Sequence, residues 1–370
     1  IDAIDEQRAI AVGTNGVIIT TDDGGEIWHK TRDTTSLYDL HFIDALNGWA
    51  VGTFGLVIRT RDGGNSYERL HPDVEAHLYG VKFLDAQTGW VVGAEGKILR
   101  TDDGGDTWIV QPSGTNEVIK TIEFVDTANG WAAGESGIIL QTTNGGTDWS
   151  IKLQDNSQNK AVAGTIFDTE FLDTKTGWLV GSQGTIFLTT SGGDAWMKAA
   201  SGTAHNLYDT GFTNSNDGWA VGANGTILFT NDGGRSWNDQ RNSARQTLKG
   251  IGFANSKRAW VVGHDGTILT TNNGGRIWFT EDVGTSQNIN KIQVIDETAA
   301  FAVGNLGLFL SYNGRPEVYL GINLWAIAGL VATVAGSIFL WRRYLITPSD
   351  RIRSKSYKRS DSWRSGWEHR

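Results

Sequence analysis

One spacing constrains the fold of this chain more than any other feature: a tryptophan recurs about every 41 residues. The series is Trp49, Trp90, Trp131, Trp178, Trp219 and Trp260, at intervals of 41, 41, 47, 41 and 41 residues. Ile10 and Phe301 extend it by one unit at each end, which makes eight units. The longer interval contains a polar insertion with Asn156, Gln158 and Lys160. Self-similarity at a fixed period indicates one small structural unit packed against copies of itself.

Each unit has the composition of four short strands. Four β-branched or aromatic segments are separated by glycine or Asx turns, a pattern typical of antiparallel strands. A four-stranded unit cannot bury both faces alone, and radial repetition solves this as a β-propeller. We therefore predict an all-β propeller of four-stranded blades over residues 1–314. Eight blades are favoured, with the missing outer strand supplied from upstream of Ile1; seven blades, with one terminal unit outside the ring, is the alternative.

A long uncharged segment follows the repeats. Residues 318–341 contain no charged side chain and would form roughly 36 Å of helix, enough to cross a bilayer. Aromatic residues lie near both ends, and seven Lys or Arg residues follow within 342–359. The positive-inside rule then predicts an extracytoplasmic propeller, a transmembrane helix at 318–341 and a basic cytoplasmic tail at 342–370. A buried core helix is the alternative. Export would require an N-terminal signal, which we expect to have been cleaved or to lie upstream of Ile1.

Two features indicate how such a span and body would interact with partners. Ala328, Ala332 and Gly336 recur at i, i+4 and i+8, a small-residue stripe that would let another transmembrane helix approach closely. The net charge is about −15 for residues 1–341 and +6 for the tail. An acidic body argues against nucleic acid as a partner, because phosphate binding requires a basic surface.

A glycine pair preceded by a short polar residue closes seven of the units. The polar residue is Asp23, Asp62, Asp103, Asn144, Ser191, Asp232 or Asn273. Except in one unit, which has Tyr67, a tryptophan follows: Trp28, Trp108, Trp149, Trp196, Trp237 or Trp278. Asn or Ser cannot replace a catalytic or metal-binding carboxylate, but either can accept a backbone hydrogen bond two residues on in an Asx-type turn. We therefore predict structural turns, each sealed by its aromatic residue, and no metal, since the twelfth position of a calcium loop starting at Asp102 is Ser113.

These loops resemble the Asp-box, or bacterial neuraminidase repeat. The longer consensus, as in GWVVGAEGKILRTDDGGDTW at 89–108, resembles the photosystem II stability/assembly factor family and its non-photosynthetic bacterial relatives. The resemblance covers residues 1–314. It implies a propeller whose Asp-boxes lie away from any functional face, and a role in the assembly of membrane complexes. Some relatives are associated with resistance-nodulation-division (RND) type transporters. The C-terminal span departs from the family, whose members are soluble or lipid-anchored.

The innermost strands supply the candidate binding residues. In segments such as LYDLHF (37–42), one alternating set is apolar and the other should face the central channel. The channel set is Asp39, His41, Lys82, Glu123, Asp168, Glu170, Asp209 and Lys291. A solvated polar channel without a ligand is the alternative. Tyr38, Tyr79 and Tyr208 recur at one repeat position, which we interpret as packing.

We find no enzyme signature. The arginine triad, Tyr/Glu nucleophile pair and acid/base Asp of a sialidase are not recognisable, and the histidines lack metal-ligand spacing. No cofactor or metal is predicted. The hypothesis is a non-enzymatic, membrane-anchored propeller in the periplasm or extracellular space. It would act as assembly factor or accessory subunit of an integral membrane complex, of photosystem or transporter type. A glycan-binding or sialidase-like propeller is the alternative.

Overall fold

The computed structural model describes residues 36–153 and 164–312, together with the backbone of five further strands near the two ends of the chain. Four of these strands, β1 (Asp2–Ala3), β2 (Ala9–Val12), β3 (Ile18–Thr21) and β4 (His29–Lys30), form a sheet of their own. The fifth is β32 (Trp341–Leu345). Asp23, Trp28 and the insertion residues Asn156, Gln158 and Lys160 lie outside the described residues.

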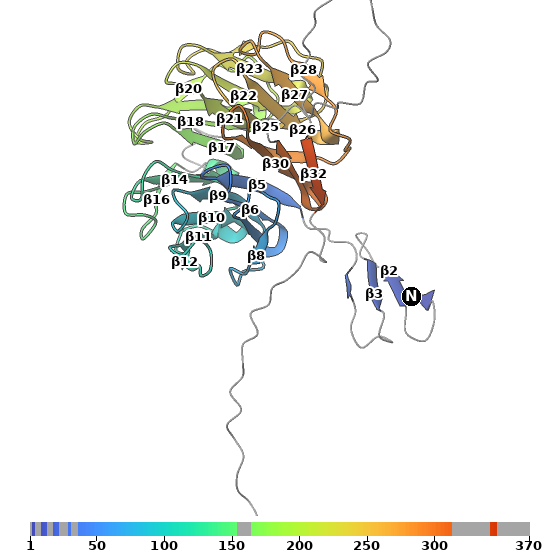
Figure 1. Cartoon of the computed structure of the whole chain (residues 1–370). Coiled ribbons are helices and arrows are strands. Elements are labelled where there is room, and N and C mark those ends of the chain that lie inside the picture. The colour runs from blue at the N-terminus through green and yellow to red at the C-terminus, as the bar shows by residue number, and fades with distance from the viewer. Residues whose placement is uncertain are drawn as a thin grey trace, which may run out of the picture.

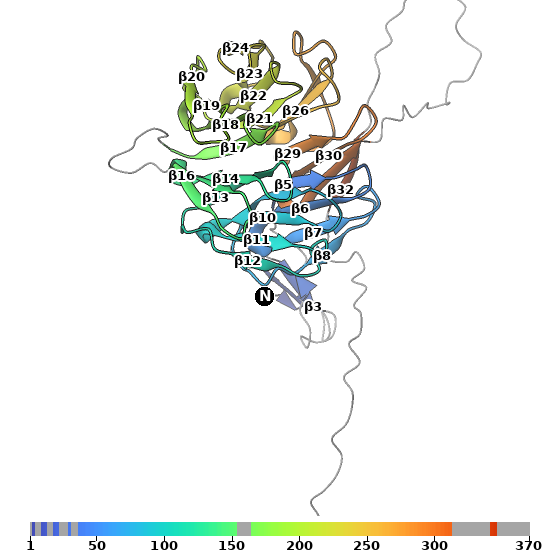
Figure 2. The ribbon, with the colours of Figure 1, turned by 90° about the vertical axis from the view of Figure 1, so that its left-hand side faces the viewer.

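Seven antiparallel four-stranded sheets are arranged as the blades of a propeller (Figures 1 and 2). The innermost strands are β5 (Leu37–Phe42), β9 (Leu78–Phe83), β13 (Ile119–Phe124), β17 (Ile166–Phe171), β21 (Leu207–Phe212), β25 (Leu248–Phe253) and β29 (Ile289–Val294). The second strands are β6 (Gly48–Gly52), β10 (Gly89–Gly93), β14 (Gly130–Gly134), β18 (Gly177–Gly181), β22 (Gly218–Gly222), β26 (Ala259–Gly263) and β30 (Ala300–Gly304).

The outer half of each blade follows the same order. The third strands are β7 (Val57–Thr60), β11 (Ile98–Thr101), β15 (Ile139–Thr142), β19 (Ile186–Thr189), β23 (Ile227–Thr230), β27 (Ile268–Thr271) and β31 (Leu308–Tyr312). The outer strands are β8 (Glu68–Leu70), β12 (Ile109–Gln111), β16 (Ser150–Leu153), β20 (Met197–Ala199), β24 (Asn238–Asp239), β28 (Phe279–Glu281) and β32. The third and outer strands are joined at the end of the propeller that carries the Asp-boxes.

Aromatic side chains of the second strands, which we call wedge residues, pack between neighbouring blades and hold them together. In four blades the tryptophan of the second strand, Trp49, Trp90, Trp131 or Trp178, packs face to face on the phenylalanine that ends the innermost strand of the next blade. Trp131, for example, stacks on Phe171 with ring centroids 3.7 Å apart, and both are buried. The Asp-box Trp196, in the same blade as Phe171, then meets this phenylalanine edge-on. Each such phenylalanine is thus enclosed by one ring from its own blade and one from its neighbour.

The ring closes between the seventh blade and the first, so the preference for eight blades was wrong and the seven-blade alternative is confirmed. Phe301, which stands where other blades have tryptophan, stacks on Phe42 at 3.7 Å. The Gln293 amide also donates to the carbonyl of Phe42 and accepts from its N–H, at 2.9 and 2.6 Å. The sheet β1–β4 pairs with no described strand of the ring, and Figure 1 shows it apart from the blades.

The outer strand of the last blade comes from the C-terminal part of the chain, and not from upstream of Ile1 as we expected. β32 pairs antiparallel with β31, with Tyr312 opposite Trp341. This strand includes Trp341, the last residue of the predicted span, and the first residues of the predicted tail. Residues 318–340, including Ala328, Ala332 and Gly336, lie outside the described residues. Within the described residues, no helix has the length and apolar character needed to cross a bilayer.

The Asp-box loops form a hydrogen-bonded turn, with a different spacing from the one predicted. Asp103 Oδ1 accepts from the backbone N–H of Thr107, four residues on and not two, at 2.8 Å. The Thr101 hydroxyl donates to Asp103 and accepts from the N–H of Gly105. Asn144 and Ser191 make the same contact with the N–H four residues on, which explains why Asp, Asn and Ser interchange here. The described Asp-boxes are therefore structural turns.

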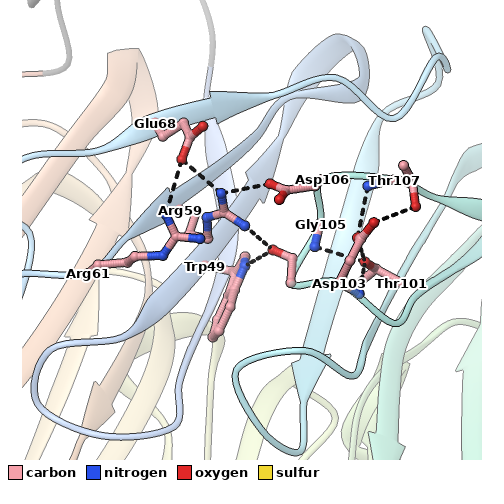
Figure 3. Close-up of polar contacts among 10 residues, drawn as sticks. Trp49, Arg59, Arg61, Glu68, Thr101, Asp103, Gly105, Asp106 and Thr107 are labelled. Carbon is pink, nitrogen blue, oxygen red and sulfur yellow. Dashed lines mark hydrogen bonds and ion pairs between the residues drawn. The ribbon is translucent and has the colours of Figure 1, made fainter. Parts of the chain in front are cut away.

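The same turn also makes hydrogen bonds to the preceding blade (Figure 3). The carbonyl of Gly104 accepts from the Trp49 indole N–H at 2.9 Å and from the Arg59 guanidinium at 2.8 Å. Arg59 is only 4% exposed and also pairs with Glu68 and Asp106, both at 2.8 Å. Gly104 has φ +76°, which turns its carbonyl toward these donors and which a side chain would disfavour. The repeated glycine thus joins blades as well as ending a hairpin.

Replacing Asp103 by alanine should lower the free energy of unfolding by about 1–3 kcal/mol, because the turn loses its acceptor. Slight burial raises the pKa of Asp103, but hydrogen bonds from Thr107 and Thr101 lower it further, to about 2. This stabilisation is therefore present above pH 4 and is lost as the pH falls toward 2. Guanidinium unfolding of Asp103→Ala at pH 7 and pH 2.5 should show a smaller difference from the parent at the lower pH. Asp103→Asn, which copies Asn144, is the control that should stay close to the parent.

Candidate functional site

The innermost strand of every blade in the ring has a β-bulge near its start. The pairing between the innermost and second strands shifts register after the first residue of the innermost strand in all seven blades. A bulge leaves one residue unpaired and changes the direction of its side chain. The side chain of the second residue of each innermost strand therefore no longer alternates between the packed face and the channel face. The third and fifth residues face the channel.

The structure places all eight predicted channel residues around one central cavity of about 460 Å³. Asp39, Asp168, Asp209 and Lys291 occupy the third strand position and form an upper layer. His41, Lys82, Glu123 and Glu170 occupy the fifth position and form a lower layer. The cavity also reaches the turns beyond β21 and β25, at the Asp-box end. That these side chains bind a ligand remains a prediction.

Lys291 crosses the channel in the upper layer. Its ammonium group lies 2.6 Å from Asp209 Oδ1 and 3.7 Å from Asp168 Oδ1, on blades two and three positions away. Burial lowers the pKa of Lys291, but Asp168, Asp209 and Asp39 raise it further, so the net value is well above the ordinary one. Burial raises the pKa of Asp168 well above its usual range, although Lys291 opposes the effect. The upper layer is thus bridged by one cation.

The upper-layer carboxylates also tie adjacent blades together. Asp39 accepts from the backbone N–H of Val81 at 2.9 Å, and Asp209 from that of Ile251 at 2.7 Å. Asp168 makes the equivalent contact with the N–H of Thr210 at 3.1 Å. Each acceptor is the third residue of one innermost strand, and each donor is the fourth residue of the next. These three aspartates therefore have a structural role beside any binding role.

The lower layer is only partly neutralised. Lys82 pairs with Glu123 at 2.7 Å. Burial, together with the charges of Lys82 and Lys291, holds the pKa of His41 well below its usual range. Glu170 makes no hydrogen bond or ion pair with any described residue. Burial first, and then the charge of Glu123, raise the pKa of Glu170 to about 8. One carboxyl group of the channel is therefore left without a partner.

The bulged residues form a collar at the other end of the channel, which sequence reasoning did not identify. Its seven members are Tyr38, Tyr79, Lys120, Phe167, Tyr208, Lys249 and Asn290. Two runs of these side chains are in contact: the Tyr38 and Tyr79 rings are 5.1 Å apart, and Lys120 Nζ lies 3.7 Å from the Tyr79 ring centroid. Phe167, Tyr208 and Lys249 repeat this order at 4.8 and 3.6 Å.

The aromatic part of the collar continues onto the adjacent rim. Phe54 projects from the turn η2 (Thr53–Gly55) with 62% of its surface exposed, and its ring centroid lies 4.9 Å from that of His77. His77 in turn contacts Tyr38 and Tyr79. We call Phe54, His77, Tyr38 and Tyr79 the aromatic rim. Phe54 has φ +54°, a conformation that is rare for a bulky residue and that the equivalent turn residue of every other blade of the ring shares.

The channel and the aromatic rim offer different chemical groups. The channel offers carboxyl and ammonium groups, and the rim offers flat aromatic surface. Within the described part of the chain, no group of three or more His, Asp or Glu residues has the geometry to hold a metal ion. The residues predicted as Asp-boxes lie at the opposite end of the propeller from the aromatic rim.

Comparison with known proteins places the chain in one family. The model for photosynthesis system II assembly factor YCF48 matches residues 67–159, 199–249 and 239–313, more than half of the chain. No curated protein gives a significant match.

Among solved structures, YCF48 bound to a D1 peptide is 24% identical, with a TM-score of 0.63, over 85% of this chain and 97% of that one. YCF48 from Cyanidioschyzon merolae is 21% identical, with a TM-score of 0.65, over 76% and 96%. The GH74 enzyme of Niastella koreensis, at 15% identity and a TM-score of 0.57 over 78% and 46%, shares the fold alone. On the match of the family model, this chain belongs to the photosynthesis system II assembly factor YCF48 family.

Proposed function

We propose that this chain is a non-enzymatic assembly factor or accessory subunit that docks onto an integral membrane protein complex through the aromatic rim. Two observations support the proposal beyond family membership. One YCF48 propeller has been solved with a D1 peptide bound, so the architecture accommodates a polypeptide segment. In this chain, the rim opposite the Asp-boxes presents Phe54 at 62% exposure in an unfavourable backbone conformation.

The exposed Phe54 is the observation that carries the proposal. Aromatic side chains in exposed clusters are typical of protein interfaces. The equivalent turn residues of other blades are mostly polar, such as Asn224 and Asp265, and they share the same positive φ. Phenylalanine therefore adds no advantage to the turn itself. Its presence beside His77 and the two tyrosines favours a role in contacting a partner.

Membrane anchoring is a further part of the proposal. The uncharged residues 318–340 would hold the propeller at the outer face of a cytoplasmic membrane, in the periplasm or extracellular space, with Trp341–Leu345 returning to the last blade as β32. A partner of photosystem or transporter type would then be reached within the plane of the same membrane. The small-residue stripe at Ala328, Ala332 and Gly336 would supply a second contact with it.

Replacing Phe54 by asparagine should remove partner binding and also stabilise the fold. Asparagine tolerates positive φ better, so the free energy of unfolding should rise by about 0.5–1 kcal/mol. The full chain is purified from native membranes in a mild detergent after cross-linking, and bound membrane proteins are quantified by mass spectrometry. Phe54→Asn should lower recovery of the main partner at least about tenfold.

Ile109→Asn is the matched control. Ile109 is also 62% exposed, but it lies on the outer strand β12, away from the rim. This variant should retain the partner at the parental level. Equal recovery with Phe54→Asn, or purification of the parent chain alone under every condition, would contradict the proposal. The identity of the protein recovered would decide between a photosystem and a transporter.

A further inference from the structure

The lower part of the channel has two unlike walls. The first to fourth blades contribute the polar side chains His41, Lys82, Glu123 and Glu170 at the fifth strand position. The fifth and sixth blades have glycine there, Gly211 and Gly252. The cavity is therefore asymmetric: two blades contribute no side chain at this position, directly beside the blade that carries Glu170, and Phe253 and Val294 pack close to the two glycines.

The second wall is largely apolar. Phe253 and Val294 line the cavity and are only partly buried. A Cβ at Gly211 would lie 2.8 Å from the Phe253 ring, and one at Gly252 would lie 2.7 Å from Val294, so larger residues do not fit without rearrangement. Phe253 is also tilted on Trp219 by 38° with centroids 4.8 Å apart, whereas Phe171 and Trp131 are nearly parallel at 3.7 Å.

The charges of the cavity are unbalanced. Five carboxyl groups and two ammonium groups line it, and His41 is held neutral. The Lys291 ammonium group pairs with Asp209 in the upper layer, and the Lys82 ammonium group pairs with Glu123 in the lower layer. Glu170 lines the cavity and makes no hydrogen bond or direct ion pair with a described residue, so the charges of Lys82 and Lys291 act on it only from a distance. A buried carboxyl without a partner is unfavourable when ionised, and a cation placed beside it would remove that cost.

We propose that this cavity binds an organic cation, a primary ammonium or guanidinium group on a short apolar stem. The cation lies beside Glu170, and the stem lies in the cavity against Phe253 and Val294. The volume of about 460 Å³ is in the range of small-molecule sites, which combine apolar walls with a few placed polar groups. This site lies at the Asp-box side of the channel and is independent of docking at the aromatic rim.

Proton release should accompany binding. Without a ligand, burial and Glu123 raise the pKa of Glu170 to about 8, so this carboxyl is largely protonated at pH 7. A bound cation favours the ionised form and lowers the pKa. Each cation bound at pH 7 should therefore displace close to one proton to the buffer. Nonspecific adsorption to an acidic surface would not release a proton in this way.

The test uses three ligands of one shape: 2-phenylethylammonium, 3-phenylpropionate and the neutral 2-phenylethanol. Each is titrated calorimetrically at pH 7 into the purified full chain in mild detergent, with empty micelles as blank. The ammonium compound should bind with a dissociation constant below about 1 mM, and the other two at least about tenfold more weakly. Titrations in phosphate and Tris, whose ionisation enthalpies differ, give the number of protons released.

Glu170→Gln should weaken binding of the ammonium compound at least about tenfold and abolish proton release, because the amide cannot ionise. Glu75→Gln, on an exposed loop, is the matched control and should behave as the parent. Circular dichroism confirms that both variants are folded. Failure of the ammonium compound to bind up to about 10 mM, equal affinity for the carboxylate, or unchanged binding by Glu170→Gln would each overturn the proposal.

Discussion

Replacing Trp131 by alanine is expected to lower the free energy of unfolding by about 3–5 kcal/mol, the usual cost of removing a large buried aromatic side chain. Trp131 is fully buried, its ring stacks on Phe171 of the next blade, and its indole N–H donates to the carbonyl of Gly192 at 2.8 Å. Alanine would leave a cavity between two blades and a glycine carbonyl without this donor. The effect should therefore be felt across the junction and not within one sheet.

Two controls separate the contributions. Trp131→Phe keeps a stacked ring, as Phe301 does at the closing junction, but loses the indole donor, so it should cost about 1–2 kcal/mol. Ile109→Ala removes a side chain that is 62% exposed and should stay within about 0.5 kcal/mol of the parent. Guanidinium unfolding followed by circular dichroism measures all three. A loss below about 1 kcal/mol in Trp131→Ala would show that the wedges do not hold the ring together.

The repeat period predicted the blade well because one local pattern specifies all four strands. The glycine and Asx turns separate alternating segments, and the interchange of Asp103, Asn144 and Ser191 already indicated a structural turn. The channel side chains followed from the same alternation. Each of these features depends on residues close together in the sequence, and neighbouring copies repeat the same signal.

Blade number depends on one contact between distant residues, which the period does not specify. Phe301 needs an aromatic partner at the end of an innermost strand. In an eight-bladed ring the partner position would be Ala3, whereas in a seven-bladed ring it is Phe42, and the structure has Phe301 on Phe42. The first unit also has Ile10 where other units have tryptophan. Pairing the wedge residues along the series would therefore have favoured seven blades.

The collar was missed because a bulge has no clear signature in these segments. Strict alternation places Tyr38, Tyr79 and Tyr208 on the packed face, which is why we interpreted them as core residues. The register shift after the first residue removes them from that face and brings them beside Lys120 and Lys249. Backbone irregularity of this kind depends on how the strand meets its neighbour in space, and the side-chain pattern alone does not reveal it.

Glu170→Gln is expected to change how stability depends on pH, quite apart from any ligand. Burial, followed by the charge of Glu123, raises the pKa of Glu170 from the ordinary 4.5 to about 8 in the folded protein. Between pH 4.5 and 8 the unfolded chain releases a proton that the folded chain retains. The stabilising effect is therefore complete below pH 4.5 and is lost as the pH rises through 8.

Glutamine resembles the protonated acid in shape and cannot ionise. The variant should be close to the parent in stability at pH 5, and more stable than the parent by roughly 1–3 kcal/mol at pH 8. Guanidinium unfolding at pH 5, 6.5 and 8 measures the difference, with Glu75→Gln as a control that should follow the parent throughout. If the parent and Glu170→Gln lose stability in parallel from pH 5 to 8, Glu170 is solvated in the folded state. The channel around Glu170 would then not be a low-dielectric site.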